Sequence, residues 1–97
     1  MIKTNEKYSW DSGKRELNIE TRGLDFVALA DFVFADPNIV IVEDERRDYG
    51  ETRYLAYAMV GETRLCLCYT PRAGKTHLIT IFKMHKKEWS KYYDTKK

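Results

Sequence analysis

Residues 53–70 have the sequence RYLAYAMVGETRLCLCYT, and this stretch decides the fold. Two apolar runs rich in aromatic and small residues flank Gly61-Glu62, which has the composition of a two-residue hairpin turn with glycine first. If the turn is tight, Val60 pairs with Thr63, and the strands Arg53–Val60 and Thr63–Thr70 form a hairpin. The stretch therefore predicts an antiparallel sheet at the centre of the fold.

Two further strands flank this hairpin in the sequence. Ile39-Val40-Ile41-Val42 precedes it and is a β-branched run, typical of a buried strand. The segment Pro71–Lys75 follows it as a turn, so that Thr70 pairs with Thr76 and the last strand covers Thr76–Lys83. On this register one face carries His77 with Tyr69, and the other carries Arg53 with Phe82. Both faces are apolar in the middle, which calls for cover on both sides by the last helix or by a partner protein.

Two helices are predicted before the sheet strands. Asp11 is a suitable N-cap for a helix over Ser12–Arg22, and Gly23 is well placed to end it. Asp25 caps a second helix, whose apolar stripe is wide enough to cover a sheet and which stops at residues 36–38.

A short strand over Lys7–Trp10 precedes this helix pair, and a helix over His85–Tyr93 closes the chain. We therefore expect one α+β domain over residues 1–97, with an N-terminal helix pair packed on a four-stranded antiparallel sheet and a C-terminal helix.

Charge is distributed unevenly along the 97 residues. Residues 1–52 carry 12 acidic and 7 basic residues, whereas residues 53–97 carry 3 acidic and 10 basic residues. A basic half attracts a polyanion such as RNA, or an acidic protein. A solvated basic end at Lys96-Lys97 is the alternative explanation for part of the excess.

Composition also limits the compartment and the chemistry. The longest apolar run, within Phe26–Phe34, is too short to span a bilayer, and the first residues lack a signal-peptide core, so we expect a cytoplasmic protein without membrane contact. Cys66 and Cys68 lie two apart on one predicted strand, a spacing poorly suited to a disulfide, and no second cysteine pair completes a metal site. We expect two buried thiols, no metal and no cofactor.

Motifs spread along residues 8–93 resemble toxins of the BrnT family. Their order and spacing are more specific than any one of them. They are Trp10-Asp11, Lys14-Arg15, Asn18, Gly23-Leu24-Asp25-Phe26, Asp36-Pro37, Arg47-Asp48-Tyr49-Gly50-Glu51-Thr52-Arg53, Tyr69-Thr70, Ile79-Thr80, Lys83, Glu88 and Tyr92.

The resemblance implies a fold similar to RelE toxins and an activity that cleaves RNA and arrests translation. It also implies a small cognate antitoxin, and operator DNA as a target of the toxin–antitoxin complex alone. The chain departs from the family pattern at Arg22, where His is usual, at His77, where Arg is common, and at Phe82, where Arg is usual. These departures keep a second hypothesis open, namely a non-catalytic binding module that retains the partner surface.

Metal-independent RNA cleavage needs proton-exchanging groups and cations that stabilise phosphate charge. Arg53 is the first candidate because its planar guanidinium matches phosphate oxygens, with a surface ion pair to Glu51 or Asp48 as the alternative. Lys83 is the second catalytic cation, and Arg47 and Arg64 are candidate RNA contacts; ordinary solvated charge is the alternative for them.

The two histidines are the candidates for proton exchange near neutral pH. His77 is the catalytic candidate, with a hydrogen-bonded edge histidine as the alternative, and His85 at the start of the last helix is a candidate RNA contact. Trp10 and Tyr69 could stack on unpaired bases, although aromatic residues in so small a sheet are also typical of a core.

Overall fold

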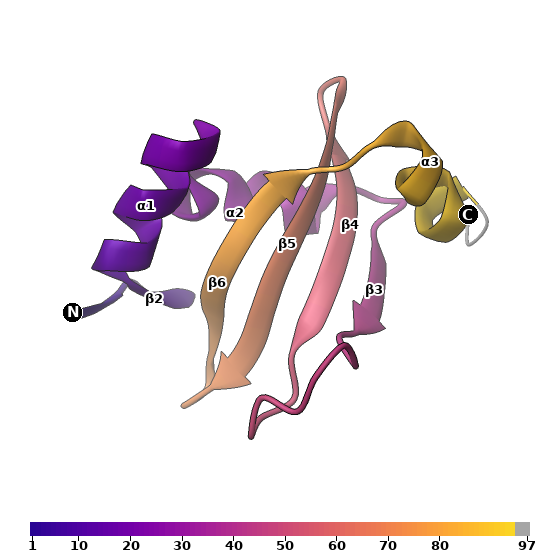
Figure 1. Cartoon of the computed structure of the whole chain (residues 1–97). Coiled ribbons are helices and arrows are strands. Elements are labelled where there is room, and N and C mark those ends of the chain that lie inside the picture. The colour runs from indigo at the N-terminus through magenta and orange to yellow at the C-terminus, as the bar shows by residue number, and fades with distance from the viewer. Residues whose placement is uncertain (95–97) are drawn as a thin grey trace.

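The structure is a computed structural model that describes residues 1–94 (Figure 1). In chain order its elements are β1 (Ile2–Thr4), β2 (Tyr8–Asp11), α1 (Ser12–Arg22), α2 (Phe26–Ala35), β3 (Val40–Glu43), β4 (Tyr54–Val60), β5 (Thr63–Arg72), β6 (Lys75–Lys83), α3 (Lys86–Trp89) and the π-helix η1 (Ser90–Asp94). The described strands form one sheet in the order β1-β2-β6-β5-β4-β3. The α+β class is confirmed. No described helix is long and apolar enough to cross a membrane.

The four strands predicted after the helix pair are antiparallel neighbours, β3–β6, but the described sheet is larger than predicted: it has six strands and is mixed. The first predicted strand joins this sheet as β2 and runs parallel to β6, with Ser9 opposite His77. β1 adds to β2 as an antiparallel edge strand of three exposed residues, too short to give a sequence pattern. β2 and β6 lie far apart in the sequence, so their pairing depends on tertiary packing and not on a local sequence pattern.

The helix pair forms as predicted, because both N-caps do. The Asp11 carboxylate accepts from the backbone N–H of Lys14 at 3.0 Å, and Gly23 ends α1 in the left-handed region at φ 67°. Asp25 caps α2 and also accepts two hydrogen bonds from Arg15, at 3.0 and 2.8 Å, which join the two helices.

α2 packs on one face of the sheet, which we call the helix-side face, whereas α1 lies beside the edge of β6 (Figure 1). Phe26, Ala30 and Val33 of α2 are fully buried against the central strands. Asn18 of α1 extends the β6 ladder, because its side chain donates to the carbonyl of Ile81 at 3.0 Å and accepts from the N–H of Ile81 at 3.0 Å.

The turn between β5 and β6 corrects the predicted register. It is a two-residue turn, Ala73-Gly74, with both φ angles positive at 52° and 77°, rather than the five-residue turn that the sequence suggested. Thr70 therefore pairs with His77 and not with Thr76. Because side chains alternate along a strand, this one-residue slip moves His77 to the opposite face.

A β-bulge then restores the predicted faces, but not the predicted pairs, further along β6. The register shifts between Cys68 and Tyr69, so that Leu67 lies opposite Ile81. Between the turn and the bulge the one-residue slip persists. Leu78 therefore joins the core under α2, and Ile79, at the bulge, joins the cluster on the other face, the reverse of the prediction for these two residues.

The closing helix covers the other face, which we call the open face, only at one side (Figure 1). It begins as predicted after His85 but has two parts, α3 and η1. Trp89 and Tyr93 stack with ring centroids 4.2 Å apart, and both pack on β4. The part of the open face beside Arg53 and His77 is not under this helix.

Candidate functional site

The corrected register brings Arg53 and His77 to the same end of the open face. Arg53 directly precedes β4, and the hydroxyl of Thr70, the cross-strand neighbour of His77, donates to the carbonyl of Thr52 at 2.6 Å. Because β5 lies between β4 and β6, the backbones of Arg53 and His77 are separated by two strand spacings, roughly 10 Å. An arginine side chain can cross much of that separation.

The loop before β4 is ordered around the buried carboxylate of Asp44. This carboxylate accepts two hydrogen bonds from the Arg46 guanidinium, both at 2.8 Å, and one from the Tyr49 hydroxyl at 3.0 Å. The Arg46 hydrogen bonds outweigh the effect of burial and lower the pKa of Asp44 to about 2. The guanidinium of Arg53 lies 4.1 Å from the centre of the Tyr49 ring, so the Asp44 network also supports Arg53.

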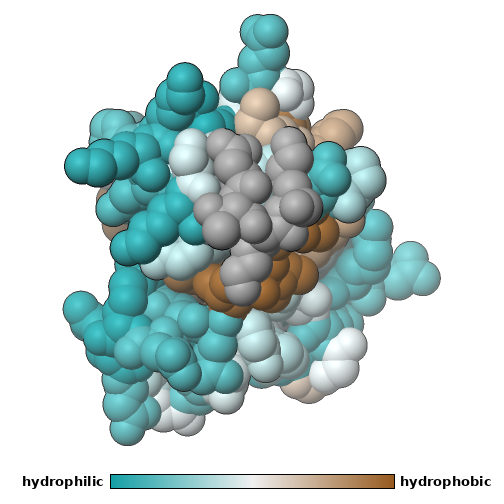
Figure 2. All heavy atoms as spheres, turned by 90° about the vertical axis from the view of Figure 1, so that its right-hand side faces the viewer, coloured by the Kyte–Doolittle hydropathy of each residue, from teal (hydrophilic) through white to brown (hydrophobic). Residues whose placement is uncertain are grey.

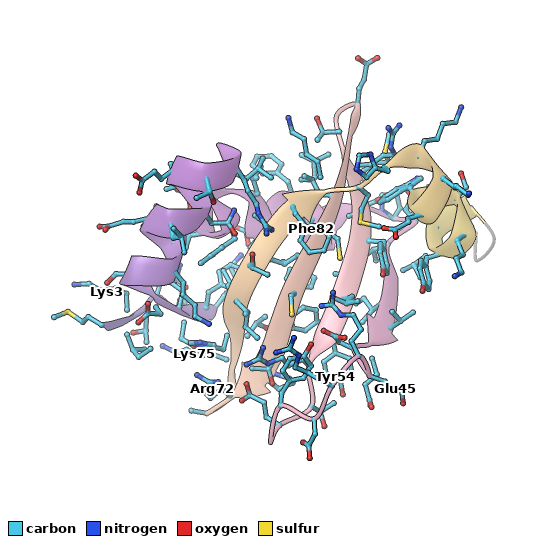
Figure 3. All side chains as sticks on the ribbon, viewed as in Figure 1. Lys3, Glu45, Tyr54, Arg72, Lys75 and Phe82 are labelled. Atoms are coloured by element: carbon cyan, nitrogen blue, oxygen red, sulfur yellow. The ribbon has the colours of Figure 1, made fainter. Side chains whose placement is uncertain are left out.

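Glu51 connects two guanidinium groups at this end of the sheet. Its carboxylate accepts from Arg72 at 2.8 Å and from Arg53 at 3.2 Å. These hydrogen bonds, led by that from Arg72, lower the pKa of Glu51. Figure 3 shows Arg72 and Tyr54 at the same end of the sheet, where β5 ends and β4 begins. The site therefore holds two arginines around one carboxylate, an arrangement that leaves net positive charge for an anion.

His77 is 6% exposed, and its Nδ1 lies 2.8 Å from the Ser9 hydroxyl oxygen on β2. Burial is the largest cause that lowers the pKa of His77, and the positive charges of Arg72 and Lys14 act in the same direction. Glu51 opposes them. His77 therefore favours the neutral form near pH 7, and it is electrostatically coupled to the residues that surround Arg53.

Lys83, Arg64 and His85 lie at the opposite end of the sheet. Lys83 is opposite Leu65 of the helix-side core, and it lines a cavity of about 230 Å³ together with Arg64, next to the Gly61-Glu62 turn. His85 precedes α3, is exposed and makes no side-chain cap hydrogen bond. The structure therefore does not bring Lys83 together with Arg53 and His77.

The remaining candidates have different surroundings. Arg47 is exposed in the loop, with its guanidinium 6.0 Å from the centre of the Tyr49 ring. Trp10 is 8% exposed and lies in the helix-side core. Tyr69 is partly buried against that core and stacks on Tyr54, with the two ring centroids 5.6 Å apart. The structure thus leaves Arg47 accessible and packs most of both aromatic rings inside.

Arg72 and Ser9 are the site residues that sequence reasoning missed. Arg72 was assigned to a turn, although it ends β5 opposite Lys75. Ser9 approaches His77 only through the parallel pairing of β2 with β6. Lys14 was quoted as part of a motif, and its charge reaches His77 from the start of α1.

Two of the departures from the family pattern are in contact. The Arg22 guanidinium lies 5.4 Å from the centre of the Phe82 ring and is 3.4 Å from the carbonyl oxygen of Ile81, to which it donates. The open face therefore has a guanidinium close to position 82 even though that residue is phenylalanine.

The described thiols and carboxylates do not form a disulfide or a metal-binding cluster. Cys66 and Cys68 are buried and free, as predicted, and burial raises the pKa of Cys66 to about 12. Within residues 1–94, no group of three or more His, Cys, Asp or Glu side chains is arranged to hold a metal ion.

Comparison with known proteins gives one match. The family model described as the ribonuclease toxin, BrnT, of type II toxin–antitoxin systems matches residues 10–88. No curated protein and no solved structure matches the chain. The matched range includes Arg53, Arg72 and His77, together with the Asp44 network that supports Arg53.

Proposed function

Because this chain belongs to the BrnT family of ribonuclease toxins of type II toxin–antitoxin systems, we propose that it cleaves RNA, arrests translation and is neutralised by a cognate antitoxin. The observation that carries the proposal is that Arg53, Arg72 and the buried His77 lie at the same end of the open face, beside rather than under α3. The activity belongs in the cytoplasm, where the RNA is, and operator DNA is a target of the toxin–antitoxin complex alone. The RelE-like character of the fold is part of the same proposal.

Arg53 and Arg72 are the proposed phosphate-binding residues. Cleavage through the ribose 2′-hydroxyl passes through a phosphorane with extra negative charge, which preorganised cations stabilise without a metal. Glu51 holds both guanidiniums from one side, so the donors that it does not use remain for phosphate oxygens. Glu51 thereby orients the two arginines and remains ionised at neutral pH.

His77 is the proposed proton-exchanging residue. Such a residue must keep a hydrogen-bond partner in both protonation states when it is buried. The Ser9 hydroxyl can donate to Nδ1 of the neutral ring and can accept from Nδ1–H of the charged ring, because a hydroxyl is both donor and acceptor. Ser9 therefore allows His77 to gain and lose a proton without an unsatisfied buried group.

The remaining cations belong further along the RNA. Arg47 is exposed beside the Arg53 loop and suits a neighbouring phosphate. Lys83, Arg64 and His85, at the other end of the sheet, are too far from Arg53 to share its phosphate. Trp10 and Tyr69 contribute chiefly to the core, so base stacking is not their main role.

A non-catalytic binding module is the alternative, and one observation favours it. The Glu51 carboxylate is bonded to both Arg53 and Arg72, so RNA binding has to compete with this ion pair. A scaffold that had lost catalysis would retain such a pair as a structural link.

Incubation of the purified chain with synthetic RNA separates the two functions. We expect cleavage that persists in a metal chelator, because the site uses cations of the protein instead of a metal. It should leave a 2′,3′-cyclic phosphate, because the 2′-oxygen bonds to phosphorus as the 5′-oxygen leaves with a proton. Wild-type chain that leaves the RNA intact under all conditions would support the binding module. Cleavage that the chelator stops would contradict the proposed chemistry.

The low pKa of His77 predicts a pH-dependent stability. The unfolded ring binds a proton below its ordinary pKa of 6.5, whereas the folded ring resists protonation. The unfolded state therefore binds more protons in this window, and the free energy of unfolding falls as the pH drops below 6.5 toward the folded pKa. In urea denaturation, His77→Gln should lose less stability than the wild type between about pH 7.5 and 5.5. The matched control is His85→Gln, the same substitution at an exposed position. An unchanged dependence in His77→Gln would contradict the assignment.

A further inference from the structure

A second feature of the open face is a groove of about 530 Å³ beside α3, which we call the acidic groove. Leu55, Tyr57 and Phe82 form much of its apolar lining. The segment that joins β3 to the Asp44 loop forms one wall, and α3 with η1 forms the other. In Figure 3, Glu45 of the first wall and Phe82 of β6 mark two sides of this region.

The rim of the groove is negatively charged. Glu43, Glu45 and Glu88 line it and are exposed, and none of them forms an ion pair with a described residue. The fourth carboxylate, Asp44, is already neutralised by Arg46. The groove therefore has a surplus of three negative charges, in contrast to the two arginines at the Arg53 end.

The negative rim and the apolar lining together indicate which class of molecule the groove can bind. An RNA strand is repelled by three unpaired carboxylates, whereas basic side chains are attracted by them. The apolar lining gains free energy when other apolar groups exclude water from it. A peptide segment with lysine or arginine next to apolar residues satisfies both conditions.

We propose that the acidic groove binds a basic, apolar segment of the cognate antitoxin. This proposal rests on the proposed function, which supplies the antitoxin. The new content is the surface on which the antitoxin docks and the types of antitoxin residue that bind there. RNA and antitoxin then use neighbouring parts of the open face, since the backbone N–H of Asp44 in the groove donates to the carbonyl of Arg53.

The groove is also connected to the catalytic end. Asp44 lines the groove and accepts the hydrogen bond from Tyr49, whose ring supports the Arg53 guanidinium. A segment in the groove lies directly beside this network. Docking there gives the antitoxin access to the Arg53 loop, and so a physical route to inhibition.

Charge reversal on the rim tests the proposal. The binding partner is the protein encoded by the adjacent reading frame, and the readout is its dissociation constant at two salt concentrations. The double variant Glu43→Lys with Glu45→Lys should weaken binding about tenfold or more and reduce its salt dependence, because like charges then face each other. The free variant should cleave RNA at the wild-type rate.

The matched control is Glu16→Lys with Glu20→Lys, which makes the same change in net charge at exposed positions of α1. It should bind the partner as the wild type does. The proposal is overturned if the rim variant binds within twofold of the wild type, if both variants weaken equally, or if the wild type does not bind. It is also overturned if sedimentation shows that the groove joins two copies of this chain. RNA cleavage by the free chain is measured separately, so failure of docking is distinguishable from failure of the ribonuclease function.

Discussion

Arg53→Ala should reduce the rate of RNA cleavage about a hundred- to a thousandfold, the range found when one preorganised donor to a transition-state anion is removed. Arg53 is the guanidinium that the Tyr49 ring and Glu51 hold in place, so its donors are oriented before the phosphate arrives. The melting temperature should change little. The ion pair with Glu51 is partly exposed, and such pairs contribute little to stability.

Two further variants sharpen this test. Arg47→Ala removes an exposed guanidinium from the same loop and should lower cleavage far less, because it lacks the Glu51 contact. Arg72→Ala should resemble Arg53→Ala, since the two arginines share the carboxylate. If Arg53→Ala cleaves at the parental rate, the phosphate does not bind here, and the cations around Lys83 become the next candidates.

The sequence was sufficient for the local structure of the domain. Helix caps depend on one side chain and the next few backbone N–H groups, so Asp11 and Asp25 could be assigned correctly from neighbouring residues. The Gly61-Glu62 hairpin depends on equally local geometry, and the pairing of Val60 with Thr63 is confirmed. These features required no knowledge of how the chain closes.

The catalytic end could be predicted only in part, because it depends on register. Arg53 and His77 were proposed as residues but assigned to opposite faces, and one residue of slip at the Ala73-Gly74 turn reversed that assignment. Ser9 was missed because its distance from His77 in the sequence is 68 residues, and only the parallel β2–β6 pairing brings them together. The acidic groove likewise combines Glu43 and Glu88 from distant segments.

Trp89→Ala should have the largest effect on stability. Trp89 is 4% exposed, stacks on Tyr93 and meets the edge of Tyr57. Truncation of a buried tryptophan removes apolar burial and leaves a cavity, at a cost of about 3–5 kcal/mol. Natural domains are stable by only about 5–15 kcal/mol, so the variant should lose a large part of its stability in urea denaturation. Lys87→Ala, at an exposed position of the same helix, should stay within about 0.5 kcal/mol of the wild type.

The same variant tests whether the acidic groove depends on α3 while the Arg53 site does not. Figure 2, which looks at the side formed by β3 and α3, shows apolar surface among hydrophilic residues. Trp89 anchors the helix that carries Glu88 and adjoins Tyr92, so its loss should impair the acidic groove. Arg53, Arg72 and His77 belong to strands and loops that do not contain Trp89. At a temperature where Trp89→Ala is still folded, it should therefore cleave RNA but bind the antitoxin weakly. Equal loss of both activities would instead mean that the acidic groove and the Arg53 site form one cooperative unit.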